Sequence, residues 1–312
     1  MDNGDNLSEI YWIGPILTFE TKNVCAVITL YNPSKRELVN LATISKQVGI
    51  LIIMDNSGKS MSNVREMLQT LSFDAQCKVI YFKNEENLGI PKSFNRGVKI
   101  GRKMGALYFF FLDQDSFIEE DVVKRLLLCR NELLSFNPGI VAGNNIGTIM
   151  EGKKLKKIYY LIRNMYEDRN TKEVFRPIFS GWIVSNELLQ EVGPFNDILF
   201  LDAVDHEYSF RVLKEGYRNF ICKNAIIHHE IGSVLYLKKS RFRITMNTYG
   251  RTFYYIRDTI RVARTYFQEF PVLSVELLLS VILVIVKGIL FGEPKKDYID
   301  NILRALRESK KS

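Results

Sequence analysis

An apolar run that ends in two acids constrains this chain more than any other stretch. Residues 107–112 read Leu-Tyr-Phe-Phe-Phe-Leu, and Asp113, Gln114 and Asp115 follow directly. Such a run predicts a strand buried on both faces of a sheet. The acids then stand where the strand leaves the sheet, the edge where open α/β sheets bind ligands. Their oxygens suit Mg²⁺ or Mn²⁺. A solvated turn, with Asp115 or Ser116 capping the next helix, is the competing interpretation.

Strand and helix patterns alternate through the first half of the chain. Buried strands are expected at residues 24–30, 50–54, 78–82 and 107–112, with helices at 34–48, 64–71 and 93–104 between them. Repeated strand–helix–strand units build a doubly wound sheet with helices on both faces. The expected fold class is therefore α/β, with a single, mostly parallel sheet.

The rest of the chain is less regular and ends in a different kind of region. Helices are expected at 122–136 and 188–192 and over the end of 201–211, and strands or apolar segments at 140–147, 179–185 and 221–227. Residues 1–22 read as an arm, 23–234 as the α/β domain with halves 23–116 and 117–234, and 235–312 as a helical C-terminal region.

Polar residues at the ends of the first four strands form a candidate nucleotide site. From the first strand to the fourth they are Thr29, Tyr31 and Asn32; Asp55 and Asn56; Asn87, Gly89, Ser93 and Asn95; and Asp113, Gln114 and Asp115. The chain has neither a GxGxxG nor a GxxxxGK[ST] loop, which disfavours a nicotinamide enzyme or a P-loop ATPase. A nucleotide whose diphosphate is held by a metal fits the residues that are present.

A second acidic pair, Asp205 and Glu207, lies far downstream. An acid at a separate place is what a transfer reaction needs as a general base. The simpler interpretation is a pair of acids stabilised by the dipole at the start of a helix. His229, one of three histidines, is either structural or the third ligand of an Asp/Asp/His metal site.

Charge and cysteine content narrow the class of partner and compartment. The net charge is +8 and the pI about 9.1, which suits a polyanionic or membrane-surface partner. The basic residues are too dispersed to indicate nucleic acid. The four cysteines are far apart, so neither a zinc site nor a disulfide framework is expected. No signal peptide is recognisable at the N-terminus, and a cytoplasmic location is expected.

The C-terminal region combines arginines and aromatics with an apolar stretch. Residues 271–291 are interrupted only by Glu276 and Lys287, and their uninterrupted part, 277–286, is about ten residues long. That is short of the roughly 20 residues that a spanning helix needs. A buried helix or one lying in the bilayer surface is expected, and the nearby arginines suit an anionic leaflet. A homodimer interface is the third interpretation.

Taken in order, these motifs resemble glycosyltransferase family 2, which has the GT-A fold, and within it the bacterial rhamnosyltransferases. The matching segments are 27–33 (VITLYNP), 53–57 (IMDNS), 87–90 (NLGI), 111–116 (FLDQDS), 181–182 (GW), 200–207 (FLDAVDHE) and 251–258 (RTFYYIRD). The resemblance extends over residues 24–264 and more loosely over the apolar tail. It implies a nucleotide-binding half, 23–116, and an acceptor-binding half, 117–234.

The resemblance also implies roles for individual residues. Asp113 and Asp115 match the Asp-x-Asp that holds the divalent ion on the donor diphosphate, with His229 near that ion, and Asp205 matches the general base. The donor-binding positions are Thr29, Tyr31, Asn32, Asp55, Asn56, Asn87, Gly89, Ser93, Asn95 and Gln114, of which Asp55 matches the acid that bonds the pyrimidine. The acceptor side has Gly181, Trp182 and Glu207.

The function implied is inverting, metal-dependent transfer of a sugar. The favoured donor is dTDP-L-rhamnose, and the acceptor a lipid-linked glycan at the inner face of the cell membrane, in surface polysaccharide (O-antigen) synthesis. A UDP-hexose or UDP-galactofuranose transferase is the alternative within the family. A non-catalytic sugar-nucleotide-binding subunit is the alternative of another class. Val204, Tyr208 and Asp258 depart from residues common in the family, which weakens the choice of sugar.

Overall fold

The computed structural model of the protein describes residues 21–58, 63–146, 165–229, 234–236, 243–245 and 249–310. Side chains are described for the same residues except 229, 234–236, 243–245 and 249. The expected N-terminal arm lies outside this set apart from residues 21 and 22, and so does the side chain of His229.

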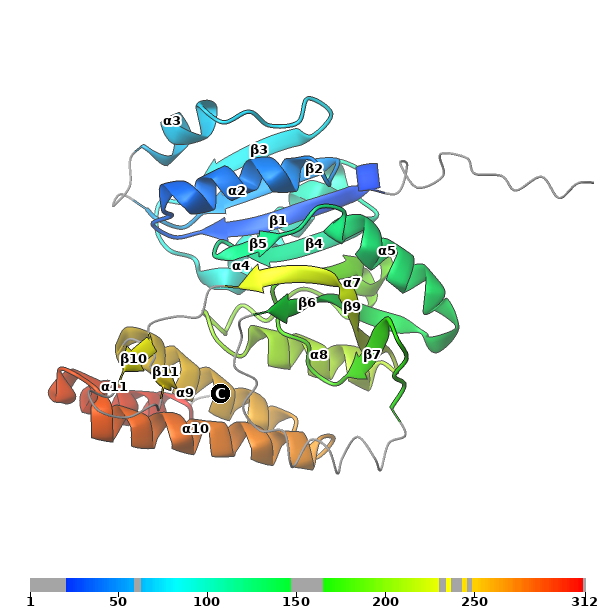
Figure 1. The fold of residues 1–312 in the computed structure, drawn as a ribbon. Helices are drawn as coiled ribbons and strands as arrows, with labels where there is room; N and C mark the ends of the chain where they lie inside the picture. The colour runs from blue at the N-terminus through cyan, green and yellow to red at the C-terminus, as the bar shows by residue number, and fades with distance from the viewer. Residues whose placement is uncertain are drawn as a thin grey trace, which may run out of the picture.

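The first half of the chain forms the parallel part of one large sheet (Figure 1). Strands β1 (Val24–Leu30), β2 (Ile50–Asp55), β3 (Lys78–Lys83) and β4 (Tyr108–Asp113) lie in the order β3-β2-β1-β4, each parallel to its neighbour. Helices α2 (Lys35–Ser45), α3 (Val64–Gln69) and α4 (Gly89–Lys103) connect them. Each helix returns the chain to the same end of the sheet, which makes the strands parallel. The alternation expected from the sequence is confirmed.

The second half continues the sheet in mixed directions. Strand β8 (Trp182–Ser185) is antiparallel to β4 and to β6 (Pro138–Ile146), and β9 (Arg218–His229) is parallel to β6. The short strands β5 (Ser116–Ile118) and β7 (Thr171–Val174) are antiparallel to β9. The helices here are α5 (Val122–Glu132), the 3₁₀ helix η1 (Leu134–Phe136), α7 (Asn186–Glu191) and α8 (Val204–Lys214). The α/β class with a single large sheet is confirmed, and the first half of the chain forms the uniformly parallel part of that sheet.

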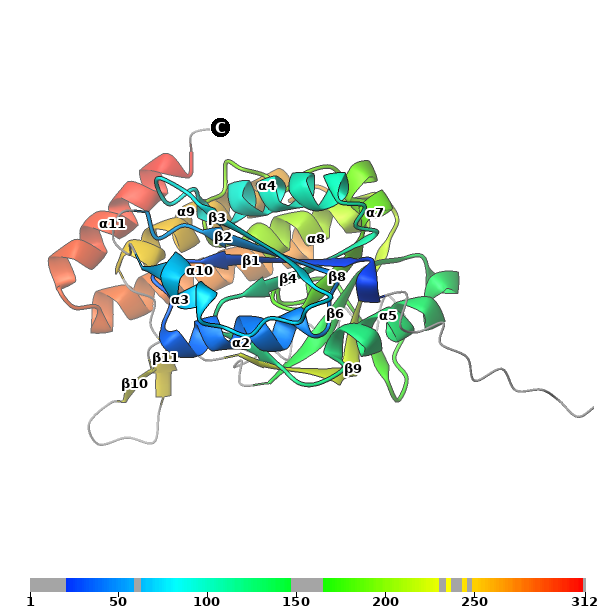
Figure 2. The same ribbon diagram turned by 90° about the horizontal axis from the view of Figure 1, so that it is seen from above.

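Helices cover both faces of the sheet because its central strands are apolar on both sides. Successive residues of a strand point to opposite faces. Cys25 and Val27 of β1 pack in one cluster with Phe94 of α4, whereas Val24 and Ala26 pack in a second cluster with α2 and α5. Figure 2 shows α4 and α8 on one side of the sheet, and α2 and α5 on the other. This arrangement leaves the strand ends as the place for a site.

Three helices form the C-terminal region. Helices α9 (Tyr249–Thr265), α10 (Pro271–Phe291) and α11 (Lys295–Glu308) follow the small hairpin of β10 (Val234–Tyr236) and β11 (Arg243–Thr245). Both α10 and α11 pack on α9 (Figure 1) around a cluster that includes Phe253, Val281 and Ile302. The expected C-terminal helices are therefore confirmed.

Helix α10 is longer than the uninterrupted apolar stretch suggested. It has 21 residues, and among the described residues it is the one helix that is long and apolar enough to cross a membrane. Its Glu276 forms an ion pair at 2.8 Å with Arg176, which lies between β7 and β8. Contacts with α9, α11 and Arg176 hold one side of α10 against the protein.

Candidate active site

A cavity of about 810 Å³ lies at the carboxyl ends of β1 and β4. The loop before α8 and the first turns of α9 complete its wall. The structure brings many of the predicted site residues together on this wall: Thr29, Tyr31, Asn56, Asn87, Gly89, Asp113, Gln114, Asp115 and Asp205. Residues from distant parts of the sequence meet here because parallel strands end at one edge of the sheet.

The exits of β1 and β4 are joined by hydrogen bonds. The backbone N–H of Tyr31 donates to Oε1 of Gln114 at 2.7 Å, and Nε2 of Gln114 donates to the carbonyl of Tyr31 at 3.3 Å. The next residue, Asn32, donates its backbone N–H to Oγ of Ser57 at 2.8 Å. Gln114 thus fixes the loop that presents the half-exposed ring of Tyr31 at the cavity.

Asp113 and Asp115 supply two partly exposed carboxylates to the cavity. The backbone N–H of Asp113 donates to Oγ of the buried Ser180 at 3.1 Å, which fixes the end of β4. Among residues with described side chains, no three His, Cys, Asp or Glu gather as a metal cluster. Two carboxylates still fit Mg²⁺ or Mn²⁺, because such ions are commonly held by one or two carboxylates together with substrate phosphates and water.

Asp55 and Asn56 are held inside the end of β2. Asp55 is fully buried, and its two oxygens accept from the N–H of Ser57 at 2.8 Å and the hydroxyl of Tyr81 at 2.6 Å. Oδ1 of Asn56 accepts from Oγ of Ser93 at 3.0 Å. Asn56 reaches the cavity wall, whereas Asp55 and Ser93 lie behind it.

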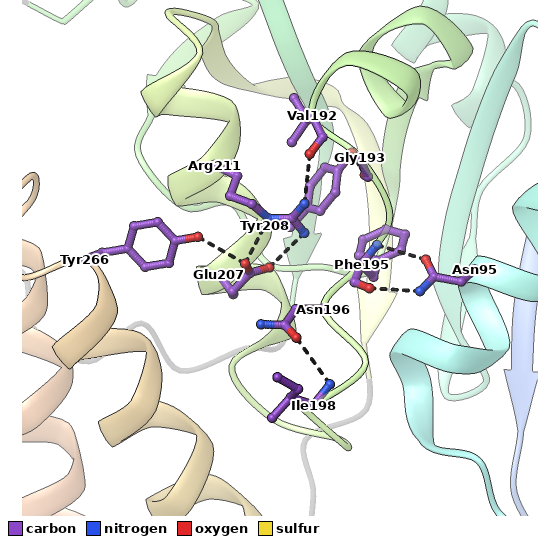
Figure 3. A network of polar contacts seen from close by, with 10 residues as sticks. All are labelled: Asn95, Val192, Gly193, Phe195, Asn196, Ile198, Glu207, Tyr208, Arg211 and Tyr266. Atoms are coloured by element: carbon purple, nitrogen blue, oxygen red, sulfur yellow. Dashed lines mark hydrogen bonds and ion pairs between the residues drawn. The ribbon is translucent and has the colours of Figure 1, made fainter. Parts of the chain in front are cut away.

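The start of α4 is pressed against the loop that precedes α8. Gly89 has a φ of +76°, and a Cβ there would lie 2.4 Å from the carbonyl oxygen of Phe200, so the backbone requires glycine. The N–H of Ile90 donates to the same oxygen at 2.8 Å. Asn87 accepts from the N–H of Gly89 at 2.9 Å. One turn later, the amide of Asn95 exchanges two 2.8 Å bonds with the backbone of Phe195 (Figure 3), so it supports this loop from outside the cavity.

Asp205 stands in the first turn of α8, after Ala203 in the left-handed region at φ +62°. Its side chain is 24% exposed, and Oδ1 accepts from the N–H of His206 at 2.8 Å. Burial raises the pKa of the Asp205 carboxyl, and this effect exceeds the opposing influence of the His206 N–H and of Arg176 and Arg251. A carboxylate with a raised pKa is a stronger base.

Glu207 faces away from the cavity and joins helices. Its carboxylate accepts from Nε and Nη2 of Arg211 at 2.8 and 2.9 Å and from the hydroxyl of Tyr266 at 3.0 Å (Figure 3). Tyr266 follows α9 directly. The observed contacts of Glu207 are therefore structural: an ion pair within α8 and a hydrogen bond from α8 to the C-terminal region.

Gly181 and Trp182 lie in the core behind the cavity. A Cβ on Gly181, at φ +91°, would be 1.9 Å from Cδ1 of Ile227. Trp182 is fully buried, with its ring centroid 4.7 Å from that of Phe179. Phe179 itself lines the cavity, so Trp182 supports the wall rather than forming it.

Two charged residues of the cavity were absent from the predicted site. Asp202 precedes α8, Arg251 lies on α9, and Arg251 Nη2 is 3.1 Å from Oδ1 of Asp202. The charges of Asp202, Asp113 and Asp115 raise the pKa of Arg251. Arg251 begins the last matching motif, but sequence alone does not show that α9 returns to the strand ends.

Known proteins are similar to this chain in sequence. The family model described as "Glycosyl transferase family 2" matches residues 25–193, more than half of the chain. A curated relative from Shigella flexneri, "dTDP-rhamnosyl transferase RfbF", is 26% identical over 255 residues, which are 78% of this chain and 80% of the relative.

Two solved structures share the fold. One is GalNAc-T7 with UDP, GalNAc and Mn²⁺, with a TM-score of 0.55 and 11% identity; the match covers 91% of this chain and 56% of that one, so this chain spans little more than half of GalNAc-T7. The other is S. aureus TarS 1–349 in complex with UDP-GlcNAc, with a TM-score of 0.52, 10% identity, and coverage of 92% and 81%. Fold, cavity and family match agree: the chain belongs to glycosyl transferase family 2.

Proposed function

We propose that this glycosyltransferase inverts the configuration of the sugar it transfers and that Asp205 is its general base. The observation that carries the proposal is that Asp205 and the pair Asp113 and Asp115 line one cavity, although they come from distant parts of the chain. A transferase needs a group that stabilises charge on the leaving group and a base that accepts the proton of the attacking hydroxyl. The two lie on opposite sides of the reacting carbon.

The carboxylate of Asp205 accepts the proton of an acceptor hydroxyl while that oxygen bonds to the anomeric carbon of the donor. The bond from this carbon to the diphosphate oxygen breaks, and its electron pair leaves with the diphosphate. Attack from the face opposite the leaving group inverts the anomeric configuration. The raised pKa of Asp205 supports this role, because the carboxylate then takes up a proton more readily.

Asp113 and Asp115 are the proposed ligands of Mg²⁺ or Mn²⁺, with His229 as a predicted third ligand. When bound, the ion supplies positive charge that stabilises the charge growing on the diphosphate. Arg251 adds a cation from the chain itself, at the same end of the cavity.

The nucleotide is proposed to lie along the ends of β1, β2 and α4. Thr29, Tyr31, Asn56, Asn87 and Gly89 face the cavity. Gln114 also lines the cavity and bonds to Tyr31. The remaining predicted donor residues support this wall through their hydrogen bonds: Asn32, Asp55, Ser93 and Asn95. Acceptor binding by Gly181, Trp182 and Glu207 stays a prediction, and Phe179 is the residue through which Trp182 would act.

The favoured donor is dTDP-L-rhamnose. The name of the Shigella flexneri relative supports this choice, and the coverage of about four fifths of both chains supports comparing the whole proteins. A UDP-hexose or UDP-galactofuranose is the alternative, because the solved structures that share the fold contain UDP or UDP-GlcNAc.

The acceptor is proposed to be a lipid-linked glycan at the cytoplasmic membrane face, where α10 contacts the bilayer surface. Eight large apolar residues of this helix are between 44% and 58% exposed: Val272, Val275, Leu279, Ile282, Leu283, Val286, Ile289 and Leu290. They recur at helical spacing, and this array exceeds the scattered exposed apolar residues of ordinary surfaces.

Donor hydrolysis tests the proposed function. The protein is incubated with dTDP-L-rhamnose, UDP-glucose, UDP-GlcNAc and UDP-galactofuranose, each with Mg²⁺ or Mn²⁺ and again with EDTA. Metal-dependent release of dTDP from dTDP-L-rhamnose is expected. Release of UDP alone would keep the mechanism and replace the donor. Binding of a donor without any turnover, also in the presence of membrane extracts as acceptor source, would favour a non-catalytic sugar-nucleotide-binding subunit.

A further inference from the structure

The carboxylate of Asp202 is a buried group of the cavity that the proposed mechanism does not use. Its side chain is 8% exposed and belongs to the cavity wall. Oδ1 accepts two hydrogen bonds from Arg251, from Nε at 3.2 Å and Nη2 at 3.1 Å. Oδ2 is shielded from solvent and has no hydrogen-bond partner among the described residues. Arg251 therefore holds one oxygen, and the other lacks a donor.

A buried acceptor without a donor is unfavourable, and an ordered water, an ion or a ligand commonly satisfies such a group in a native protein. Asp202 lines the cavity, where a ligand can reach its carboxyl group. Burial raises the pKa of Asp202, and Arg251 opposes that rise. Sites built around a polar group of this kind select a ligand hydroxyl, because a ligand that lacks it leaves the group unpaired.

The segment that carries Asp202 is fixed on two sides. The ring of Phe200 stacks on Tyr254 of α9 with centroids 4.5 Å apart. The backbone N–H of Phe200 donates to Oδ2 of Asp258 at 3.3 Å. On the other side its carbonyl accepts from Ile90 of α4 at 2.8 Å. The backbone next to Asp202 is therefore held in place before a ligand arrives, as discrimination between similar ligands requires.

The position of Asp202 identifies which hydroxyl it would meet. On one side is Arg251, which lines the cavity together with Asp113 and Asp115. On the other is Asp205, three positions further along the chain and in the same cavity wall. In the proposed reaction, the group between the diphosphate and the general base is the transferred sugar.

We propose that the Asp202 carboxylate turns slightly when the donor binds, so that Oδ2 accepts a hydrogen bond from a ring hydroxyl of the transferred sugar while Arg251 keeps its hydrogen bonds to Oδ1. Asp202 is thus a specificity-determining residue for the donor. The inference rests on the proposed function, because it takes a nucleotide sugar as the ligand.

The test combines deoxy donors with Asp202→Asn. Hydrolysis of dTDP-L-rhamnose and of its analogues lacking the 2-, 3- or 4-hydroxyl is measured without acceptor, so no acceptor hydroxyl contributes. Loss of a hydrogen bond to a charged group lowers kcat/KM by about 10- to 100-fold, and one analogue should show this loss in the wild-type protein. In Asp202→Asn, which keeps an oxygen for Arg251, the same analogue should lose only about two- to tenfold relative to the intact donor, and less than in the wild-type protein, because hydrogen bonds to neutral groups are weaker.

Asp197→Asn is the matched control, since Asp197 is an exposed aspartate of the same segment that does not line the cavity. It should keep the wild-type pattern. An equal loss in the wild-type protein and in Asp202→Asn for every analogue would overturn the inference. The inference would also be overturned if the wild-type protein hydrolysed all three deoxy analogues with the kcat/KM of the intact donor, and this result needs no variant. If only UDP-glucose is hydrolysed, its deoxy analogues replace the rhamnose series. If the wild-type protein turns over no donor, with or without membrane extracts as acceptor source, the proposed function fails and the inference with it.

Discussion

At the scale of single residues, the acid–base properties of Asp205 should appear in the pH dependence of the reaction. A general base must be ionised, so activity is present above its pKa and lost as pH falls through it. Burial raises this pKa, so the acidic limb of log kcat/KM should lie above the ordinary aspartate value of about 3.9. The measurement is kcat/KM for transfer against pH, with unfolding followed over the same range. An acidic limb at or below the ordinary value would contradict the assignment.

Replacement of the same carboxylate gives a second prediction. Positioned base catalysis contributes about 10²- to 10⁴-fold, so Asp205→Asn should lower kcat for transfer by that factor while the affinity for donor changes little. The control is Glu119→Gln. Glu119 is 43% exposed, pairs with His228 at 3.1 Å and does not line the cavity, so its loss should leave kcat near the wild-type value. An Asp205→Asn protein with full activity would remove Asp205 from the mechanism.

At the scale of secondary-structure elements, Glu207 has a role predicted from its motif that differs from the role indicated by its contacts. The Phe-Leu-Asp-x-x-Asp-x-Glu motif placed Glu207 on the acceptor side, whereas the structure surrounds it with Arg211 and Tyr266. The spacing of Glu207 and Arg211, four positions apart on a helix, was a signal for an ion pair. The contact with Tyr266 had no local signal, because it depends on how the end of α9 packs on α8.

We therefore expect Glu207→Gln to act mainly on stability. The change leaves Arg211 without its charged partner and should lower the free energy of unfolding by on the order of 1–3 kcal/mol. Tyr266→Phe removes one hydrogen bond to this carboxylate and should cost about 1.5–3 kcal/mol, the range for hydrogen bonds to charged groups. Urea unfolding measures both, alongside KM for the acceptor. Unchanged stability with a raised acceptor KM in Glu207→Gln would instead support the acceptor role.

At the scale of the whole molecule, features set by local sequence pattern could be predicted, whereas contacts between distant segments could not. The four apolar runs of the first half define β1 to β4, and their polar exits meet in the cavity because parallel strands share one edge. The short strands β5 and β7 have three and four residues, too few for a recognisable periodicity. The pair of Asp202 and Arg251 joins two segments whose proximity is set only by packing of α9.

The exposed apolar array of α10 carries no charge, which favours a lipid surface as the partner of this helix. Glu276, one of two charged residues within α10, is turned inward to Arg176 at 2.8 Å. Lys287 is half-buried, so the exposed positions of the apolar array carry no charge. The array lies one helix away from the cavity, because α10 packs on α9, which supplies Arg251 and Tyr254 to the wall. A bilayer beneath α10 would bring a lipid-linked acceptor close to the site.

Vesicle binding tests this arrangement. The variant Leu279→Gln/Leu283→Gln/Val286→Gln changes three residues that are 44%, 52% and 46% exposed. Burial of an apolar side chain contributes about 1.5–3 kcal/mol when complete, so half of that for three residues should weaken partition into phosphatidylglycerol–phosphatidylethanolamine vesicles by at least about tenfold. The matched control, Val39→Gln/Leu134→Gln, changes residues that are 49% and 58% exposed elsewhere on the molecule and should bind as the wild-type protein does.

Binding should also persist at high salt, since apolar contact is not screened. Unchanged vesicle binding in the triple variant would exclude α10 as the membrane contact, and a dimer that the triple variant dissociates would assign the array to a second copy of the chain.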